Sequence, residues 1–249
     1  MLLSLEIPVK HVKEFILLTD FSFGLAHLFL QKYPEYSDYE QTHTGCLLDN
    51  SMYELGESLT NDQLVEAAAV SHCGAVIAPD WMDDFGRTMD ATLELIRKRP
   101  QGARWTVGGV VQGRNYEERR KCFVQMHAQH CSPICFPFRT PRNETISRLL
   151  AEGRLGKNQW YHLLGLQQLQ ELQWRLPGVW SLDTAKPFKG YRMDAAQEIR
   201  GHGKIDLFGQ LDLTKRRTAG WNIAFMRKLA AYDETQGLTK AQRRKRKDF

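Results

Sequence analysis

The residues of this sequence that could do chemistry stand at the ends of short apolar runs. Asp49, Asp80 and Asp183 each close such a run, and Gln112 closes another. Carboxylates that converge on one site repel one another unless a ligand, a cation or a shared proton relieves the repulsion. An aspartate at such a position can also simply cap the next helix, but four aspartates in seven runs favour a shared site. The residues that close the runs are Asp20, Asp49, Asp80, Gln112, Arg139, Gly165 and Asp183.

Two kinds of chemistry suit this carboxylate cluster. Divalent-metal catalysis would need histidine or glutamate beside the aspartates, and only His202, in a Gly-His-Gly loop, looks free to reach a site. Glycosyl transfer needs one carboxylate to attack an anomeric carbon and a second to move protons. Gln112, followed by Gly113, favours glycosyl transfer at a purine, because an amide offers a donor and an acceptor to the edge of the base.

The apolar runs predict the elements that hold these residues. Each run is nearly continuous, as expected of a parallel strand that is buried on both faces. Asp49, Asp80 and Gln112 follow one another at intervals of 31 and 32 residues, which leaves room for a helix between strands. The predicted strands lie within residues 14–20, 45–49, 74–80, 105–113, 133–138, 160–166 and 179–183, with an eighth in 204–211.

Helical patterns fill the intervals between these runs. In residues 61–72 one helical face is formed by side chains at helical spacing, of which Leu64 is the first and Ser71 the last. Thr60 or Asn61 can cap the start of this helix. Further helices are predicted within residues 87–99, 115–130 and 143–154. Seven or eight such units favour a single closed (β/α)8 barrel, whose chemistry lies at the carboxyl ends of the strands. We expect this barrel to span residues 1–235 and a basic tail to follow at 236–249.

Composition narrows the class of protein. The chain has 249 residues, 42% of them hydrophobic, but it has no apolar run of about 18 residues and no signal-peptide layout. We therefore expect no membrane association and a cytoplasmic location, in the host cytoplasm if a phage encodes it. Five cysteines without a compact pattern indicate reduced thiols. Cys131 and Cys135, with His127 and His130 nearby, could form half of a zinc site, but buried thiols are favoured and no metal is predicted.

Basic residues are unevenly distributed along the chain. The formal net charge is +5, the last ten residues contain six basic side chains, and residues 215–217 form another basic cluster. Such clusters can be solvated surface, but they are also what a protein needs to neutralise nucleic-acid phosphates.

Five segments, in this order and spacing, resemble the tRNA-guanine transglycosylase superfamily. They are LLDNSMYELG (47–56), VIAPDWMDD (76–84), GVVQGRNYEERR (109–120), YHLLGLQQLQEL (161–172) and VWSLDTAKP (179–187), and the resemblance covers about residues 43–190. LDNS, FPFRTPR (136–142) and SLDT resemble the DNA-modifying, phage-type branch, which inserts 7-deazaguanines into DNA. The zinc site that three cysteines and a histidine form in the tRNA enzymes has no counterpart, because no cysteine follows Cys135.

The resemblance implies a role for each site residue. Asp183 would attack C1′ of a deoxyguanosine and expel guanine, and Asp49 would serve as general acid and then base. Asp80 and Gln112 would hold the edge of the purine. The other residues expected at the base are Gly113, Gly165 and Phe136. Two displacements retain the β configuration, and no cofactor is expected.

The same resemblance implies contacts with a flipped base and with DNA. The aromatic rings of Phe21, Trp81 or Phe136 could sandwich the base, although large aromatic residues near a barrel mouth are more often packing residues. The candidates for phosphate contacts are Arg139, Arg142, Lys186, Lys189, Lys215, Arg216 and Arg217. Ser51 and Met52, where the tRNA enzymes have two glycines, change the expected pocket wall. The expected partners are DNA and a free 7-deazaguanine base such as 7-cyano-7-deazaguanine, with exchange on tRNA and a non-catalytic nucleic-acid-binding subunit as alternatives.

Overall fold

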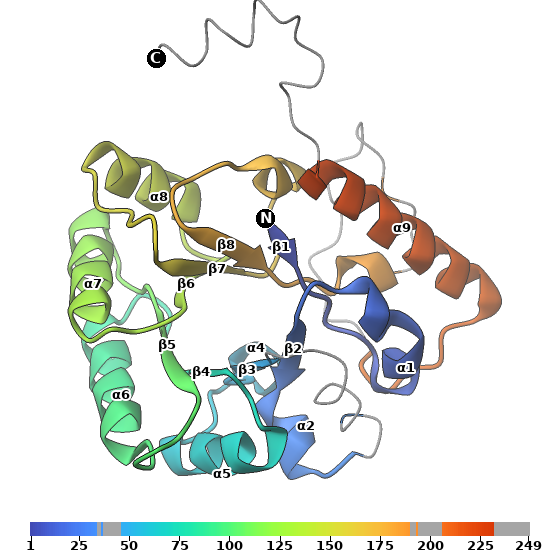
Figure 1. Cartoon of the computed structure of the whole chain (residues 1–249), viewed down its shortest axis with the longest axis horizontal. Coiled ribbons are helices and arrows are strands. Elements are labelled where there is room, and N and C mark those ends of the chain that lie inside the picture. The colour runs from blue at the N-terminus through green and yellow to red at the C-terminus, as the bar shows by residue number, and fades with distance from the viewer. Residues whose placement is uncertain (34–35, 37–45, 190–192, 194–205, 232–249) are drawn as a thin grey trace, which may run out of the picture.

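The computed structural model describes residues 1–33, 36, 46–189, 193 and 206–231. Within them, eight parallel strands form one curled sheet in the order β1-β8-β7-β6-β5-β4-β3-β2, with helices around its outside (Figure 1). The strands are β1 (Leu2–Leu3), β2 (Ser22–Leu25), β3 (Cys46–Asp49), β4 (Ala75–Ile77), β5 (Thr106–Val110), β6 (Ile134–Pro137), β7 (Trp160–Leu164) and β8 (Val179–Leu182). The alternation of parallel strands and helices gives a TIM-like α/β fold.

The helices follow the strands in sequence. They are α1 (Val12–Phe15), α2 (Ala26–Leu30), α4 (Met52–Leu55), α5 (Asn61–Ser71), α6 (Phe85–Lys98), α7 (Tyr116–Ala128), α8 (Arg142–Ala151) and α9 (Leu213–Ala231). Short 3-10 helices are η1 (Val9–His11), η2 (Ile16–Leu18), η4 (Leu169–Gln173) and η5 (Lys186–Phe188). No helix in the described ranges is long and apolar enough to cross a membrane.

The helix predicted over residues 61–72 is confirmed as α5. Its start is fixed by a capping box, in which the Thr60 side chain accepts from the backbone N–H of Gln63 and the Gln63 side chain accepts from that of Thr60. Leu64 and Ser71 are buried on its inner face. The three later helices predicted from the sequence correspond to α6, α7 and α8.

The two ends of the sheet are joined by hydrogen bonds at the first strand. The Asp20 N–H donates to the carbonyl of Leu3 at 2.7 Å, and the Leu3 N–H donates to Asp20 Oδ2 at 2.9 Å. The Ser4 hydroxyl donates to the carbonyl of Phe21 at 2.7 Å. Asp20 therefore links β1 to the segment that leads into β2, and it does not stand at the carboxyl end of a strand as predicted.

Two of the predicted strands are wrong. Residues 14–20 form the end of α1, then η2 and a turn, because Phe15 and Ile16 are buried while Leu17 is 73% exposed, which is helical rather than strand spacing. The strands at this end of the chain are instead β1 and β2. The eighth strand predicted in 204–211 is absent over residues 206–211, which form a turn and backbone without regular secondary structure, and its first two residues lie outside the described part.

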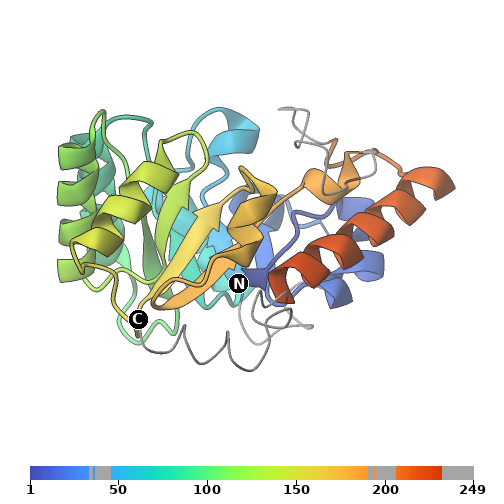
Figure 2. The same cartoon turned by 90° about the horizontal axis from the view of Figure 1, so that it is seen from above.

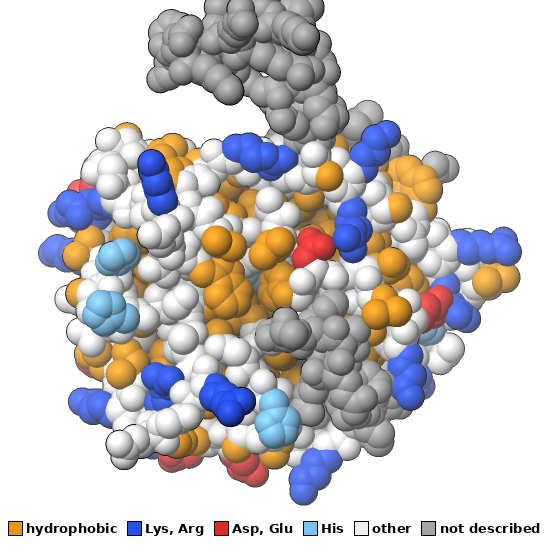
Figure 3. All heavy atoms as spheres, in the orientation of Figure 1, with side chains coloured by type: hydrophobic (Ala, Val, Ile, Leu, Met, Phe, Trp, Pro, Cys, Tyr) orange, Lys and Arg blue, Asp and Glu red, His pale blue; other side chains and the backbone are white. Residues whose placement is uncertain are grey.

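The carboxyl ends of the strands lie on the side of the molecule away from the N-terminus. In Figure 2, α4, which follows the carboxyl end of β3, lies at the upper edge, and the N-terminus lies on the lower side. Figure 3 shows the N-terminal face, where Lys and Arg side chains are spread around the rim and hydrophobic ones gather near the centre. Leu2 and Val179, at the starts of β1 and β8, are 43% and 50% exposed.

Candidate active site

The four polar residues singled out from the sequence lie at the carboxyl ends of their strands. Asp49 is the last residue of β3, and Asp183 directly follows β8. Asp80 and Gln112 lie in the segments that follow β4 and β5. All four side chains are buried, and Asp183 and Asp80 both raise the pKa of Asp49 through their charge. The structure thus brings the predicted carboxylates together at one end of the sheet.

Asp80 and Gln112 form a fixed pair. Gln112 Nε2 donates to Asp80 Oδ2 at 2.6 Å, and Asn50 Nδ2 donates to Asp80 Oδ1 at 2.8 Å. The amide orientation of Gln112 is set by the Asp83 N–H, which donates to its Oε1 at 3.3 Å. Burial raises the pKa of Asp80, while the hydrogen bonds from Asn50 and Gln112 oppose that rise. The pair presents an acceptor and an amide in a defined geometry at the carboxyl end of the sheet.

Asp49 lies in a setting that favours its protonated form. Burial raises the pKa of Asp49 well above its ordinary value, and the negative charge of Glu54 adds to the rise. The Ser51 N–H donates to Asp49 Oδ2 at 2.8 Å and opposes the shift. Ser51 adopts a left-handed conformation with φ of 61°, and its hydroxyl lies 2.9 Å from His27 Nδ1. Burial lowers the pKa of His27 to about 4, so this ring is neutral at neutral pH.

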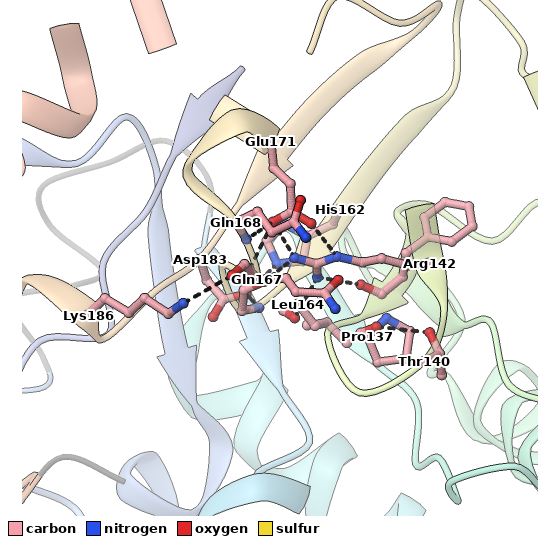
Figure 4. Close-up of polar contacts among 12 residues, drawn as sticks. Pro137, Thr140, Arg142, His162, Leu164, Gln167, Gln168, Glu171, Asp183 and Lys186 are labelled. Carbon is pink, nitrogen blue, oxygen red and sulfur yellow. Dashed lines mark hydrogen bonds and ion pairs between the residues drawn. The ribbon is translucent and has the colours of Figure 1, made fainter. Parts of the chain in front are cut away.

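Asp183 is held through one of its two carboxylate oxygens. Asp183 Oδ1 accepts from the Gly165 N–H at 2.9 Å and lies 3.0 Å from His162 Nε2 (Figure 4). Gly165 has φ of +70°, a conformation that costs a residue with a Cβ more than it costs glycine. A Cβ at this position would also lie 3.2 Å from the ring of Phe138. Gly165, which sequence analysis assigned to base binding, here positions the carboxylate of Asp183.

The backbone conformation and the close neighbours at position 113 favour a glycine there. Its φ is +149°, and a Cβ would lie 2.7 Å from Cβ of Glu118 and 2.8 Å from the backbone nitrogen of Arg119. The Gly113 carbonyl accepts from Arg119 Nη1 at 3.3 Å. The glycine therefore allows the chain to turn tightly from Gln112 into α7.

Two polar residues near these carboxylates were not predicted from the sequence. Glu6 follows β1, and its pKa is raised well above the ordinary value by burial first and then by the charges of Glu54, Asp183 and Asp49. The false strand at 14–20 hid Glu6, because the true first strand is only two residues long. His162 was taken for part of a strand without a role. Its place two residues after Trp160, on the same face of the strand, was the available signal.

The predicted role of Arg142 as a phosphate contact is wrong. Its side chain is wholly buried and forms a two-pronged ion pair with Glu171, Nε to Oε1 at 2.9 Å and Nη2 to Oε2 at 2.5 Å. The same guanidinium donates to the carbonyls of Phe136, Leu164 and Gly165 (Figure 4). Because every side of the guanidinium faces protein, Arg142 ties the ends of β6 and β7 to η4 and reaches no external phosphate.

Two aromatic residues also lie away from the predicted base site. Phe136 is 1% exposed and its ring stacks on Phe123 of α7 and Trp180 of β8, in the layer between sheet and helices. Phe21 precedes β2 and packs edge-on against Trp160, the first residue of β7, so it lies at the amino ends of the strands. Neither ring can sandwich a base at the carboxyl ends.

Trp81 and three of the predicted cationic residues have surroundings that leave their predicted roles open. Arg87 lies 4.0 Å above the Trp81 ring, and Arg139 lies 5.2 Å from the ring of Tyr53. Lys186, whose Nζ donates to the Gln167 carbonyl at 3.4 Å, has its pKa lowered to about 8 by burial and then by the charge of Lys189.

The basic cluster at 215–217 opens α9. Arg216 pairs with Glu14 at 2.9 Å, while Lys215 and Arg217 are exposed. His202 and the basic tail at 236–249 lie outside the described residues.

No group of three or more His, Cys, Asp and Glu side chains within the described part of the chain could hold a metal ion. Cys131 and Cys135, considered above as half of a zinc site, are buried free thiols. No protein-family model matches the chain, and no curated protein matches its sequence.

Proposed function

We propose that this chain is a closed (β/α)8 barrel that exchanges guanine in DNA for a free 7-deazaguanine base. The observation that carries the proposal is that two buried carboxyl groups with different surroundings stand at one end of the sheet. Asp183 accepts the Gly165 N–H and faces the His162 ring, whereas burial and the charge of Glu54 raise the pKa of Asp49. One carboxylate prepared to attack and one carboxyl prepared to donate a proton are what a retaining glycosidic displacement needs.

The reaction proceeds in two displacements. In the first, a carboxylate oxygen of Asp183 bonds to C1′ of the target nucleotide while the bond from C1′ to N9 of guanine breaks, and Asp49 gives its proton to the departing base. In the second, Asp49 takes a proton from the incoming 7-deazaguanine, whose N9 bonds to C1′ as the ester to Asp183 breaks. The β configuration is retained after two inversions. One glycosidic bond replaces another, so no cofactor has to supply energy.

Asp80 and Gln112 supply the recognition of the base. Their side chains already pair at 2.6 Å, which fixes the direction of the Gln112 amide before a base arrives. A guanine edge offers N–H donors to a carboxylate and a carbonyl acceptor to an amide. A base whose edge matches this pair can add hydrogen bonds through the remaining lone pairs of Asp80 and the second N–H of the Gln112 amide, and a base without that edge cannot. This preorganised pair therefore favours guanine-like bases over adenine.

The test is an exchange assay with radiolabelled guanine and either duplex DNA or tRNA. The expected result is label in DNA, lost in Asp183→Asn and reduced in Asp49→Asn. The matched control is Asp62→Asn, which removes an exposed aspartate on α5, outside the carboxylate cluster. Label in tRNA alone would show the other substrate class, and label in neither polymer would refute the exchange reaction.

A further inference from the structure

A chain of hydrogen bonds runs inside the sheet from the start of β7 to Asp183. Trp160 Nε1 donates to the Ser181 hydroxyl at 2.6 Å, Ser181 Oγ lies 2.9 Å from His162 Nδ1, and His162 Nε2 lies 3.0 Å from Asp183 Oδ1. His162 and Ser181 are wholly buried. Both come from adjacent strands, since His162 of β7 is in register with Ser181 of β8. The residue behind the predicted nucleophile is thus a histidine that has no contact with solvent.

The direction of each hydrogen bond follows from the donors that are available. An indole nitrogen can only donate, so the Ser181 oxygen accepts from Trp160. The Ser181 hydroxyl then has one proton to give, and His162 Nδ1 at 2.9 Å is nearer than the Tyr161 carbonyl at 3.4 Å. When Nδ1 accepts, the ring proton stands on Nε2, which donates to Asp183 Oδ1. The chain therefore fixes one tautomer of His162 and ends with a donor to the carboxylate.

Two aromatic side chains hold the ring of His162 in place. Phe23 stacks on His162 with ring centres 5.6 Å apart and planes 21° apart, and Phe21 packs edge-on at 6.0 Å. These contacts fix the plane of the imidazole and with it the direction in which Nε2 faces Asp183. An Nε2–H in this direction donates a hydrogen bond to Asp183 Oδ1 and holds that oxygen in place.

We propose that His162 is a positioning residue that occupies Asp183 Oδ1 and leaves Oδ2 as the attacking oxygen; this inference rests on the proposed function. Both hydrogen bonds to the Asp183 carboxylate among the described residues, from His162 and from the Gly165 N–H, go to Oδ1. Two donors on Oδ1 oppose rotation of the carboxylate, and no hydrogen bond from the described part of the chain occupies Oδ2, whose lone pairs can then form the bond to C1′. The Gly165 donor adds a backbone constraint that a side-chain change at 162 leaves in place.

The same geometry excludes His162 as the general base. In a histidine–aspartate dyad of the hydrolase type, the carboxylate orients the ring and the ring faces the substrate. Here both ring nitrogens are engaged and the ring is wholly buried, while the carboxylate of Asp183 stands at the carboxyl end of β8. The order is reversed, with the histidine orienting and the aspartate reacting.

The first test reads the tautomer of His162 in the free protein by ¹⁵N NMR of the histidine rings, with His162→Gln identifying the signal. The expected result is that Nε2 carries a proton and Nδ1 does not. A ring protonated on Nδ1, or on both nitrogens, overturns the proposal. This measurement needs no substrate, so its outcome does not depend on whether the protein exchanges bases.

The second test measures single-turnover formation of the covalent adduct on DNA. His162→Leu removes the donor and is expected to slow adduct formation about 10- to 100-fold, the effect of one hydrogen bond to a charged group, without weakening binding of the free base. His162→Gln, whose amide can place a donor near Nε2, is expected to restore most of the rate. Asp80→Asn is the contrasting variant, because it should weaken base binding instead.

The outcomes separate the two proposals. If wild-type protein forms adduct and His162→Leu forms it equally fast, the positioning role is wrong and the exchange reaction stands. If His162→Leu does not fold, His162→Gln and Ser181→Ala decide: rates below wild type with unchanged base binding support the role, and unchanged rates in both overturn it. If wild-type protein forms no adduct with any substrate, the proposed function fails, and the positioning role fails with it whatever the tautomer.

Discussion

The buried ion pair of Arg142 and Glu171 gives the sharpest test of the fold around the site. Both side chains are wholly buried. Arg142 makes two hydrogen bonds to Glu171 and three to the carbonyls of Phe136, Leu164 and Gly165, and Glu171 Oε2 also accepts from two backbone N–H groups of the loop before η4. We consider the substitution Arg142→Met, which keeps much of the side-chain volume and removes every donor.

The expected loss follows from the charge that is left behind. Removing one partner of a buried pair strands the other in low dielectric, which costs about 3–5 kcal/mol. The double variant Arg142→Met/Glu171→Leu removes both charges, so it should recover part of that loss. It still leaves the two loop N–H groups without an acceptor, at about 1–3 kcal/mol for a buried unsatisfied group. The single variant should therefore be the less stable of the two.

The measurement is the free energy of unfolding from urea titrations of the three proteins. Arg120→Met on α7 is the control, because Arg120 pairs with the largely exposed Glu117 and such a pair contributes about 1 kcal/mol or less. If Arg142→Met loses no more free energy of unfolding than the control variant, the structural role of Arg142 is refuted. If Arg142→Met leaves the stability unchanged and weakens DNA binding, Arg142 contacts phosphate as the sequence predicted.

Two other substitutions probe the site residues directly. Asp49→Asn should stabilise the protein at neutral pH. Burial raises the folded pKa of Asp49 above its ordinary value of 3.8. The stability that the protonated Asp49 carboxyl contributes to the wild type is therefore complete below pH 3.8 and is lost as pH rises through the folded pKa. Within that window the advantage of Asp49→Asn should grow by about 1.4 kcal/mol per pH unit. Thermal unfolding at acid and neutral pH measures it, and an advantage that shrinks as pH rises would contradict the reasoning. Gly113→Ala should cost about 1–3 kcal/mol in urea unfolding from strain and from the 2.7 Å approach to Glu118. Gly102→Ala, also at positive φ but with open space around its Cβ, should cost less, and equal losses would show that the close approach is relieved without cost.

The sequence predicted the parts of the fold that long apolar runs define. Strands β3 to β8 and the helices α5 and α7 lie within the predicted segments, while α6 and α8 begin slightly before theirs, at Phe85 and Arg142. β1 escaped because it has only two residues, and β2 was missed because the neighbouring apolar run at 14–20 was taken for the strand. The run at 14–20 is apolar enough for a strand, but tertiary packing makes it helical and leaves Leu17 in solvent.

A site residue could be predicted only where a chemically reactive residue type stands at the end of a predicted strand. Asp49, Asp80 and Asp183 satisfy both conditions. Phe136 does not, because side chains alternate along a strand and a shift of one residue turns a ring from the inside of the sheet to its outer face. Arg142 was misassigned since a sequence does not reveal that Glu171, 29 residues later, neutralises it.

The proton donor of the proposed reaction can be identified through Glu54, a residue of α4 that the sequence did not suggest. After burial, the charge of Glu54 is the largest cause that raises the pKa of both Asp49 and Glu6. Glu54→Gln removes that charge and should lower the pKa of Asp49. If Asp49 donates its proton in the first displacement, activity falls as pH rises through its pKa, and the alkaline limb of the pH profile should move to lower pH in Glu54→Gln.

The matched control is Glu57→Gln, which removes an exposed charge three residues further along the chain and should leave the limb in place. Each unit by which the limb moves lowers the protonated fraction of Asp49, and with it the rate at a fixed alkaline pH, about tenfold. Asp49→Asn should abolish the limb and lower the rate about 10²- to 10⁴-fold, the usual contribution of general acid catalysis. A limb that survives in Asp49→Asn but is lost in Glu6→Gln would transfer the donor role to Glu6, because Glu6 shares the same neighbours and the same direction of pKa shift.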